Sequence, residues 1–282
     1  RGSRTTGTAA RHVLAACDQT SAVVLASTDV DGKTNEITRF APLLDQIGDL
    51  RDTVITADAL HCQREHVDYL AERGANWIMT VKGNQPYLHR QLTGLPWRAV
   101  PDAIRDTDRG HGRREIRTLK ILTISTGIDF PHATQALQVR RRRRRLDQPK
   151  RFTTETVYAI TDLPVHQAKP AQLAAWIRGH WTIENKIHWV RDVAFDEDRS
   201  QIRTGTVPEI MAALRNAAIG ACASPAPPTS QPPSAITPAT AAAHWHYSAS
   251  ADDFAGALGL VRHLEKNRRD QLFQFFPPRS GR

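Results

Sequence analysis

The apolar positions in the first part of the chain alternate between short strand-like runs and longer helical patterns. Residues 12–16 and 22–28 are rich in apolar residues on either side of a polar turn, which predicts a β-hairpin. Residues 37–50 space their large apolar side chains three and four positions apart, as a helix does. The β-branched run 53–57 has almost no polar interruption and predicts a strand covered on both faces.

The alternation continues with a helical pattern over 62–73 and another buried strand over 77–81. A strand, helix, strand unit of this kind predicts parallel strands joined by a crossover. Over about residues 94–155 the pattern changes to long alternating stretches with Pro and Gly, which predicts an inserted β-rich segment. A strand over 156–161 follows, and then a helix that begins at Pro170. The order of elements predicts an α/β fold.

One acidic residue interrupts the apolar stripe of this last helix. Leu173, Ile177, Trp181, Glu184 and His188 recur at three- and four-residue spacing, so they share one face if residues 171–191 are helical. A lone ionised carboxylate is costly to bury unless it is paired or binds a cation. The stripe therefore leaves two interpretations open for Glu184: an ion pair with Arg178, Lys186 or Arg191, or a metal ligand.

Asp58 stands directly after the predicted strand 53–57, where open α/β sheets place functional groups. It could also be only the N-cap of the next helix. Together, a strand-end aspartate and an inward helix glutamate could bind one or two divalent cations. Oxygen ligands suit Mg²⁺, or alternatively Mn²⁺, and such ions support phosphodiester chemistry. We predict a catalytic and metal-binding pair, Asp58 and Glu184.

The charge of the chain favours a polyanionic partner. Thirty-eight Lys and Arg stand against 29 Asp and Glu, for a net charge of +9. Several basic or amide side chains near the two acids are candidates for DNA contact; they are Lys82, Asn84, Arg178, His180, Lys186 and Arg191. The six arginines at 140–145 are expected to contact DNA rather than to form a structural ion-pair array.

Cysteine content and hydropathy bear on the compartment. Three scattered cysteines predict neither a disulfide framework nor a zinc module. No apolar stretch reaches the roughly 20 residues that span a bilayer. We expect a cytoplasmic, nucleoid-associated protein without a membrane partner.

The last part of the sequence departs from globular composition. Of the 23 residues at 221–243, 20 are Ala, Pro, Ser or Thr. Such a segment is either a disordered linker or the out-of-frame reading of a GC-rich gene. Residues 244–282 show no sustained period and are expected to be an irregular, non-native tail.

Several strings resemble the DDE transposases of bacterial insertion sequences, in the insertion-sequence-4-like group with the H-repeat-associated proteins. The strings are KTNEI at 33–37, VITADALHCQ at 54–63, VKGNQPYL at 81–88, RGHGRREIRT at 109–118, RGHWTIENKIHWVRDVAFDEDRSQ at 178–201 and MAALRNAAIG at 211–220. The resemblance implies an RNase H-like catalytic domain over 1–220, with the β-rich insertion before the glutamate-bearing helix. It implies Mg²⁺-dependent cutting and joining of DNA, with Asp58 as second acid and Glu184 as third.

The sequence also departs from the pattern of the family that it resembles. In similar proteins the first acid lies in a DGK motif shortly before an RGS segment, and this sequence opens with Arg1-Gly2-Ser3. Asp31 imitates the motif but precedes a different segment, so we reject it as the first acid. His180 and Arg191 occupy positions where the family signature has other residues. We therefore expect a remnant that lacks the first catalytic Asp and has little strand-transfer activity.

The resemblance implies double-stranded DNA as the partner, in the form of both insertion-sequence ends and target DNA. A homodimer bound to DNA is also possible for such a protein. Two other functions stay open. One is a non-catalytic DNA-binding remnant, whose binding would persist without Mg²⁺ and weaken steeply with salt. The other is an RNase H-like nuclease that acts on a different nucleic acid.

Overall fold

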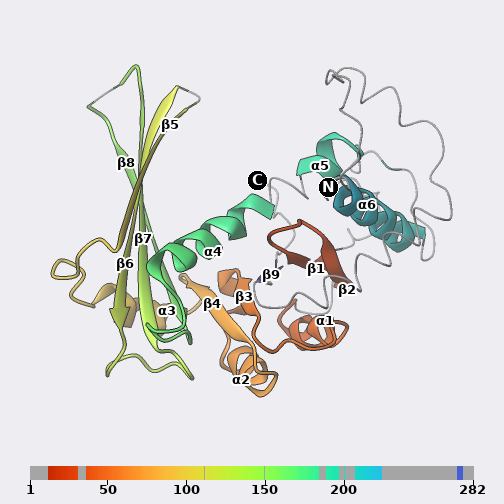
Figure 1. Ribbon diagram of the computed structural model, residues 1–282, viewed down its shortest axis with the longest axis horizontal. Helices are drawn as coiled ribbons and strands as arrows, with labels where there is room; N and C mark the ends of the chain where they lie inside the picture. The colour runs from red at the N-terminus through yellow and green to blue at the C-terminus, as the bar shows by residue number, and fades with distance from the viewer. Residues whose placement is uncertain are drawn as a thin grey trace, which may run out of the picture.

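The computed structural model has a mixed α/β architecture, consistent with an RNase H-like domain (Figure 1). It describes residues 12–30, 36–110, 112–148, 150–183, 189–196, 200, 207–223 and 272–275. Among these residues, nine strands form one sheet in the order β2-β1-β9-β3-β4-β8-β7-β6-β5. Within the described residues, no helix is both long enough and apolar enough to cross a membrane.

The chain begins with the expected hairpin. Strand β1 (His12–Asp18) pairs antiparallel with β2 (Val24–Val30), with an irregularity between Ala16 and Cys17. The Asp18 carboxylate organises the turn, because it accepts hydrogen bonds from the backbone N–H groups of Thr20 and Ser21. The turn prediction is thus confirmed, although β1 runs two residues further than the pattern indicated and β2 begins and ends two residues later.

The helix expected over residues 37–50 is wrong in extent. A 3-10 turn, η1 (Glu36–Arg39), is followed by a single short helix, α1 (Phe40–Leu44). Pro42 explains the break, because it has no N–H to donate to the carbonyl four residues earlier. The apolar spacing was real, and Phe40, Leu43 and Leu44 are all buried.

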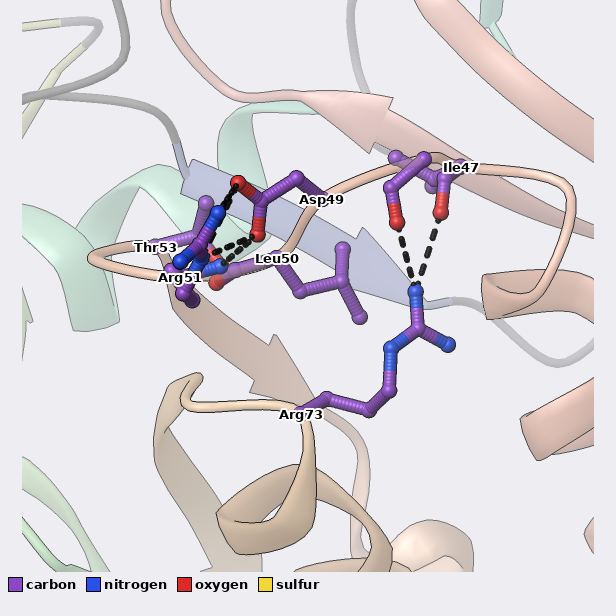
Figure 2. A network of polar contacts seen from close by, with 7 residues as sticks. Ile47, Asp49, Leu50, Arg51, Thr53 and Arg73 are labelled. Atoms are coloured by element: carbon purple, nitrogen blue, oxygen red, sulfur yellow. Dashed lines mark hydrogen bonds and ion pairs between the residues drawn. The ribbon is translucent and has the colours of Figure 1, made fainter.

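A polar network then holds the loop that leads from α1 into the next strand (Figure 2). One Nη of Arg73 donates to the carbonyl oxygens of Ile47 at 3.1 Å and Gly48 at 2.7 Å. The Thr53 hydroxyl donates to the Leu50 carbonyl at 2.5 Å, and Arg51 forms an ion pair with the carboxylate of Asp49. These contacts satisfy loop carbonyls that a helix would otherwise have paired internally.

The central crossover matches its prediction closely. Strand β3 (Val54–Ala57) is buried along its whole length, and η2 (Ala59–His61) and α2 (Arg64–Glu72) lead from it to β4 (Asn76–Val81). The two strands pair in parallel, as expected. Gly74 ends the helical segment with φ of +69°, a conformation that favours glycine.

The β-rich part of the chain is continuous with this sheet. After α3 (Pro86–Thr93) come β5 (Ile104–Gly110), β6 (Arg113–Thr123), β7 (Gln135–Arg145) and β8 (Thr153–Thr161). All four pair antiparallel with their neighbours, and β8 pairs antiparallel with β4. The long strands extend well past the helical layers in Figure 1. The segment predicted as an insertion therefore widens the core sheet.

The remaining elements are α4 (Pro170–Ile183), α5 (Trp189–Val193), α6 (Val207–Ala223) and the four-residue strand β9 (Leu272–Phe275). The helix predicted to begin at Pro170 is confirmed, and its expected continuation through Glu184 and Lys186 lies outside the described residues. Helix α6 runs to Ala223, three residues into the segment expected to be a linker. Within the tail predicted to be irregular, β9 is the part that the structure describes.

Alternate residues of the central strands point to two apolar layers. Ile55, Trp77 and Met79 belong to the large core that includes Phe40 and Leu70 from the helices on one face. Residues one position away on the same strands, such as Val54 and Ile78, pack on the other face with Leu173 of α4. The sheet is therefore covered on both faces, as the uninterrupted apolar run of β3 predicted.

Candidate functional site

Asp58 lies immediately after β3, at the carboxyl end of a strand in the middle of the sheet. Its Oδ1 accepts a hydrogen bond of 2.7 Å from the backbone N–H of Ala59, which makes it the N-cap of η2. The capping interpretation is thus confirmed. It leaves room for a second role, because the same carboxylate remains partly exposed and faces other polar side chains.

The turn after β4 brings two of the predicted residues to Asp58. Lys82 Nζ lies 3.1 Å from Asp58 Oδ1. Asn84 donates from Nδ2 to the carbonyl of Ala59 at 2.6 Å. Because β3 and β4 are parallel neighbours, both turns leave the sheet at the same edge. Lys82 supplies charge at this site, whereas Asn84 holds the backbone that follows the carboxylate.

Helix α4 approaches Asp58 from the other side through His180. The His180 Nδ1 and the Thr56 hydroxyl oxygen are 3.3 Å apart and share a hydrogen bond. Gln19, in the turn after β1, donates to the Thr56 hydroxyl at 3.4 Å and to the Trp176 carbonyl at 3.0 Å. One glutamine thus links β1, β3 and α4 beside the candidate site.

Gly179 permits this close approach of Gln19 to the helix. A Cβ atom at position 179 would lie 2.1 Å from Gln19 Oε1, much closer than real Cβ contacts. The glycine in the middle of α4, which costs helix stability, is therefore explained by packing.

Three neighbours set the charge state of Asp58. Burial by itself would raise the pKa of the carboxyl, but the Ala59 N–H, Lys82 and His180 lower it below its usual range. Hydrogen bonds and positive charge favour the ionised form more strongly than partial burial opposes it. Asp58 is therefore an anion at neutral pH, as a metal ligand must be.

Sequence reasoning missed a second carboxylate, Glu36 at the start of η1. Burial first, and then the negative charge of Asp58, raise its pKa. Its Oε2 atom is buried and has no hydrogen-bond partner within the part of the chain that the structure describes. The available signal was its position in the KTNEI string, which was noted for its resemblance without a role for the glutamate.

A cleft of about 260 Å³ opens beside these groups, between α4 and the sheet. Its floor is made by small and apolar residues of the central strands, such as Ala57, Val139 and Ala159, and His180 lies on its wall. Three arginines line it; they are Arg117, Arg141 and Arg143. Glu155 also lines the cleft, and each of the three arginines is ion-paired with Glu115 or Glu155. Positive charge is in excess at the border, which together with the apolar floor suits a ligand that carries both an apolar part and negative charge.

The arginine run divides between the two faces of β7. On the cleft face, Arg141 pairs with Glu115 at 2.9 Å and Arg143 pairs with Glu155 at 3.5 Å. On the opposite face, the guanidinium carbons of Arg142 and Arg144 lie 4.6 and 5.3 Å from the centre of the Phe152 ring. We expected the run to contact DNA rather than to form structural ion pairs. Arg141 and Arg143 nevertheless form such ion pairs, and Arg142 and Arg144 form cation–π contacts.

The other predicted residues are more scattered. Arg178 pairs with Asp106 of β5 at 3.0 Å, on the side of the long strands. Arg191 lies on α5, where its charge acts on the Cys17 thiol, whose pKa burial raises to about 12. Glu184 and Lys186 lie outside the described residues. The structure thus brings together Asp58, Lys82, Asn84 and His180.

Across the described ranges no group of three His, Cys, Asp or Glu side chains is arranged to hold a metal ion. Asp58 and Glu36 are the carboxylates that interact there.

Comparisons of the sequence with family models and with curated proteins point to the same family. The model of the family described as "Transposase DDE domain" matches residues 2–220. The H repeat-associated putative transposase YhhI of Escherichia coli K12 is 30% identical over 219 residues, which cover 74% of this chain and 57% of that protein. YbfL of the same strain shows the same identity and coverage. The putative transposase YncI of E. coli O157:H7 is 29% identical over 219 residues, 74% of this chain and 55% of its own. The chain thus spans little more than half the length of these curated relatives.

Proposed function

Because the chain belongs to the DDE transposase family, we propose that it carries the part of a transposase site that binds and processes DNA around Asp58. The observation that best supports this is the placement of an ionised strand-end carboxylate between Lys82 and His180. The arginine-lined cleft opens next to it. Phosphodiester chemistry requires carboxylates that bind a metal cation and positively charged groups that bind the phosphate.

Proteins of this family generally use a divalent metal. The donor chemistry at the site fits such an ion, because Asp58 offers a carboxylate oxygen and Glu36 has a buried oxygen without a hydrogen-bond partner among the described residues. We propose that Asp58 and Glu184 would hold Mg²⁺ or Mn²⁺. When bound, such an ion supplies Lewis-acid stabilisation of phosphoryl oxygens and helps to activate a hydroxyl.

The chain's own residues would divide the remaining work. Lys82 is half exposed, and its ammonium can donate to a DNA phosphate that lies beside Asp58. His180 shares a hydrogen bond with Thr56 and keeps α4 against the end of β3. Asn84 holds the backbone after Asp58 in place. These roles position the phosphate beside the carboxylate.

The long strands provide a wider surface for the DNA backbone. On the face that carries Arg142 and Arg144, the exposed basic residues of the strands are Arg105, Arg109 and Arg140. Lysine and arginine on one extended element release counterions from DNA when they bind it. We therefore propose that β5–β8 contact the phosphate backbone of duplex DNA, with a second copy of the protein as an option on the same DNA.

Cation binding tests the metal assignment directly. Titration with Mn²⁺, followed by electron paramagnetic resonance, should show at least about tenfold weaker binding in Asp58→Asn and in Glu184→Gln. Asp102→Asn, a change at an exposed position away from the site, is the matched control. Equal Mn²⁺ affinity in Asp58→Asn and the control would refute the site.

DNA binding tests the arginine surface. Arg109→Gln with Arg140→Gln should weaken duplex binding and reduce the dependence of log K on log salt by about 1 to 2 units. Arg98→Gln changes an exposed arginine outside the long strands and should have a smaller effect. An unchanged salt slope in the double variant would place the DNA elsewhere.

Strand transfer is the reaction that we propose for the site. In the sequence, Asp58 and Glu184 match the acid pattern that the resemblance implies, whereas Asp31 does not. The arginine surface does not depend on a metal site, so a non-catalytic DNA-binding role is the second candidate. Mg²⁺-dependent joining of a labelled element end to target DNA would support strand transfer, whereas binding without joining would favour the second candidate.

A further inference from the structure

Glu36 begins η1, and the negative charge of Asp58 acts on its carboxyl group. The Oε2 atom of Glu36 is buried and has no hydrogen-bond partner among the residues that the structure describes. We propose that Glu36 is a further oxygen ligand of the divalent cation that Asp58 would hold. This inference rests on the proposed function, because it adds a residue to the same cation site.

The directions of the strands explain why these two acids meet. Strand β2 runs antiparallel to β1, and the pairing of β9 with both β1 and β3 shows that β3 runs antiparallel to β1 as well. Strands β2 and β3 therefore end at the same edge of the sheet. Glu36 comes after β2 in the chain, and Asp58 comes directly after β3. Lys82 follows β4, which ends at this edge too, so Glu36 joins the polar groups that gather there.

The imidazole of His66 ties together the two turns that carry these acids. Its Nδ1 lies 3.0 Å from the carbonyl oxygen of His61, in η2, and its Nε2 lies 3.0 Å from the carbonyl oxygen of Ile37, the residue after Glu36. The Phe40 ring stacks on the same imidazole, with the ring centres 4.0 Å apart. Because His66 is buried, these contacts are shielded from water, and they hold η1 against η2.

Two carboxylates held in this way need a compensating positive charge. Lys82 provides one for Asp58, at 3.1 Å from its Oδ1. Among the described residues, the charge that acts on Glu36 is the negative one of Asp58, which opposes ionisation together with burial. A buried ionised oxygen without a partner is costly. A cation between the two acids would remove the repulsion and give Oε2 a partner, and carboxylate oxygens are ligands that Mg²⁺ and Mn²⁺ prefer.

A neutral Glu36 is the alternative, since a protonated carboxyl would remove the repulsion without a cation. Glutamine distinguishes the two, because it has nearly the size of glutamate and carries no charge. If Glu36 is only a neutral neighbour of Asp58, then Glu36→Gln leaves cation binding as it is. If Glu36 is a ligand, the same change removes a charged oxygen from the site and weakens cation binding.

Mn²⁺ titration of the full chain, followed by electron paramagnetic resonance, is the direct test. Glu36→Gln should bind Mn²⁺ at least about tenfold more weakly than the parent chain. Glu72→Gln, at an exposed position on α2, is the matched control and should keep the parent affinity. Glu36→Asp retains a carboxylate and should bind Mn²⁺ more tightly than Glu36→Gln. Parent affinity in Glu36→Gln, or the reverse order of the two variants at this position, would overturn the proposal.

Asp58→Asn in the same titration separates this inference from the proposed function. Weaker Mn²⁺ binding in both Asp58→Asn and Glu36→Gln is the expected result. If only Asp58→Asn binds Mn²⁺ more weakly, the cation site stands and Glu36 is not one of its ligands. If neither variant differs from the parent chain, the proposed cation site is refuted together with the role of Glu36.

Thermal unfolding with and without Mn²⁺ gives a second readout, which also shows that the variants fold. A cation that binds the folded protein raises its Tm. Without Mn²⁺, Glu36→Gln should unfold at or above the Tm of the parent chain, because a buried acid beside Asp58 is gone. With Mn²⁺ at a concentration that saturates the parent chain, the rise in Tm should be smaller in Glu36→Gln than in the parent or in Glu72→Gln. Equal rises in all three would overturn the proposal.

Discussion

Lys82 Nζ lies 3.1 Å from Asp58 Oδ1, so the turn after β4 neutralises the carboxylate at the end of β3. The contact joins the ends of two parallel strands, and His180 adds positive influence from α4. The pair is partly exposed, and its consequences are best measured as a change in the charge state of Asp58.

Replacing Lys82 should raise the pKa of Asp58. In Lys82→Gln the ammonium that favours the ionised carboxylate is gone, while the burial that opposes ionisation remains. Carbon-13 NMR titration of the aspartate carboxyl groups would measure the shift. Lys169→Gln, an exposed lysine before α4, should leave that pKa unchanged. Equal titration of Asp58 in both variants would show that Lys82 does not govern its charge.

Asn84→Ala should destabilise the fold by about 1 kcal/mol, since the carbonyl of Ala59 keeps the Cys62 N–H but loses the shorter of its two hydrogen bonds. Thermal or urea unfolding measures the effect. Gln46→Ala removes an exposed amide whose hydrogen bond to Pro42 is long, at 3.5 Å, and should be neutral by comparison. Identical stability of the two variants would mean that the turn after β4 does not hold the Asp58 loop.

The loop network of Figure 2 contains one partly buried arginine, Arg73, and one exposed arginine, Arg51. Arg73 has a side chain only 25% exposed and donates to two loop carbonyls, so Arg73→Met should cost about 2 kcal/mol of unfolding free energy. Arg51 is 76% exposed, and Arg51→Met should cause no measurable change despite its ion pair with Asp49. Urea unfolding of both variants decides the matter. A larger loss in the Arg51 variant would contradict the burial argument.

Asp162 should make the protein less stable as pH rises from 4 to 7. Burial raises the pKa of its carboxyl to about 6, even though the Trp77 N–H and the Asn76 amide donate to it. Because the pKa of Asp162 is higher in the folded protein than in the unfolded chain, its protonation stabilises the fold most at pH values below the unfolded pKa, near 3.8. This stabilisation decreases as the pH rises and is lost once the pH passes the folded pKa of about 6. The slope from this group is at most about 1.4 kcal/mol per pH unit.

Asp162→Asn provides the measurement. The asparagine does not titrate, its carbonyl can accept from the Trp77 N–H, and a turned Asn76 amide can accept from its NH₂ group. Unfolding free energies at pH 4, 5, 6 and 7 should therefore fall less steeply in the variant than in the parent chain. Parallel pH profiles would assign the dependence to other groups.

Local patterns predicted most of the regular elements, but not their extent. The run 53–57 predicted a strand covered on both faces, and β3 is buried throughout. The period over 37–50 predicted one helix, yet Pro42 and the contacts of Arg73 with Ile47 and Gly48 produce a short helix and a loop. Apolar periodicity reports which side chains face the core, and a loop can satisfy it as well as a helix can.

The candidate site was predicted in the same partial way. Asp58 and Lys82 each follow a predicted strand, so a shared sheet edge brought them together as expected. Glu36 and Gln19 were missed because each acts through contacts far away in the sequence, with Asp58 for the first and with Thr56 and Trp176 for the second. Such contacts leave no period in the sequence.

By itself, then, the sequence determined the alternation of strands and helices, the acid at the end of β3 and the family to which the chain belongs. These depend on residues that are neighbours in the chain or lie on one helix face. Only the tertiary structure decided which strand lies between β1 and β3, and which arginines of β7 face the cleft rather than Phe152. Strand pairing joins segments distant in sequence, and its energy lies in backbone hydrogen bonds that any extended segment can make.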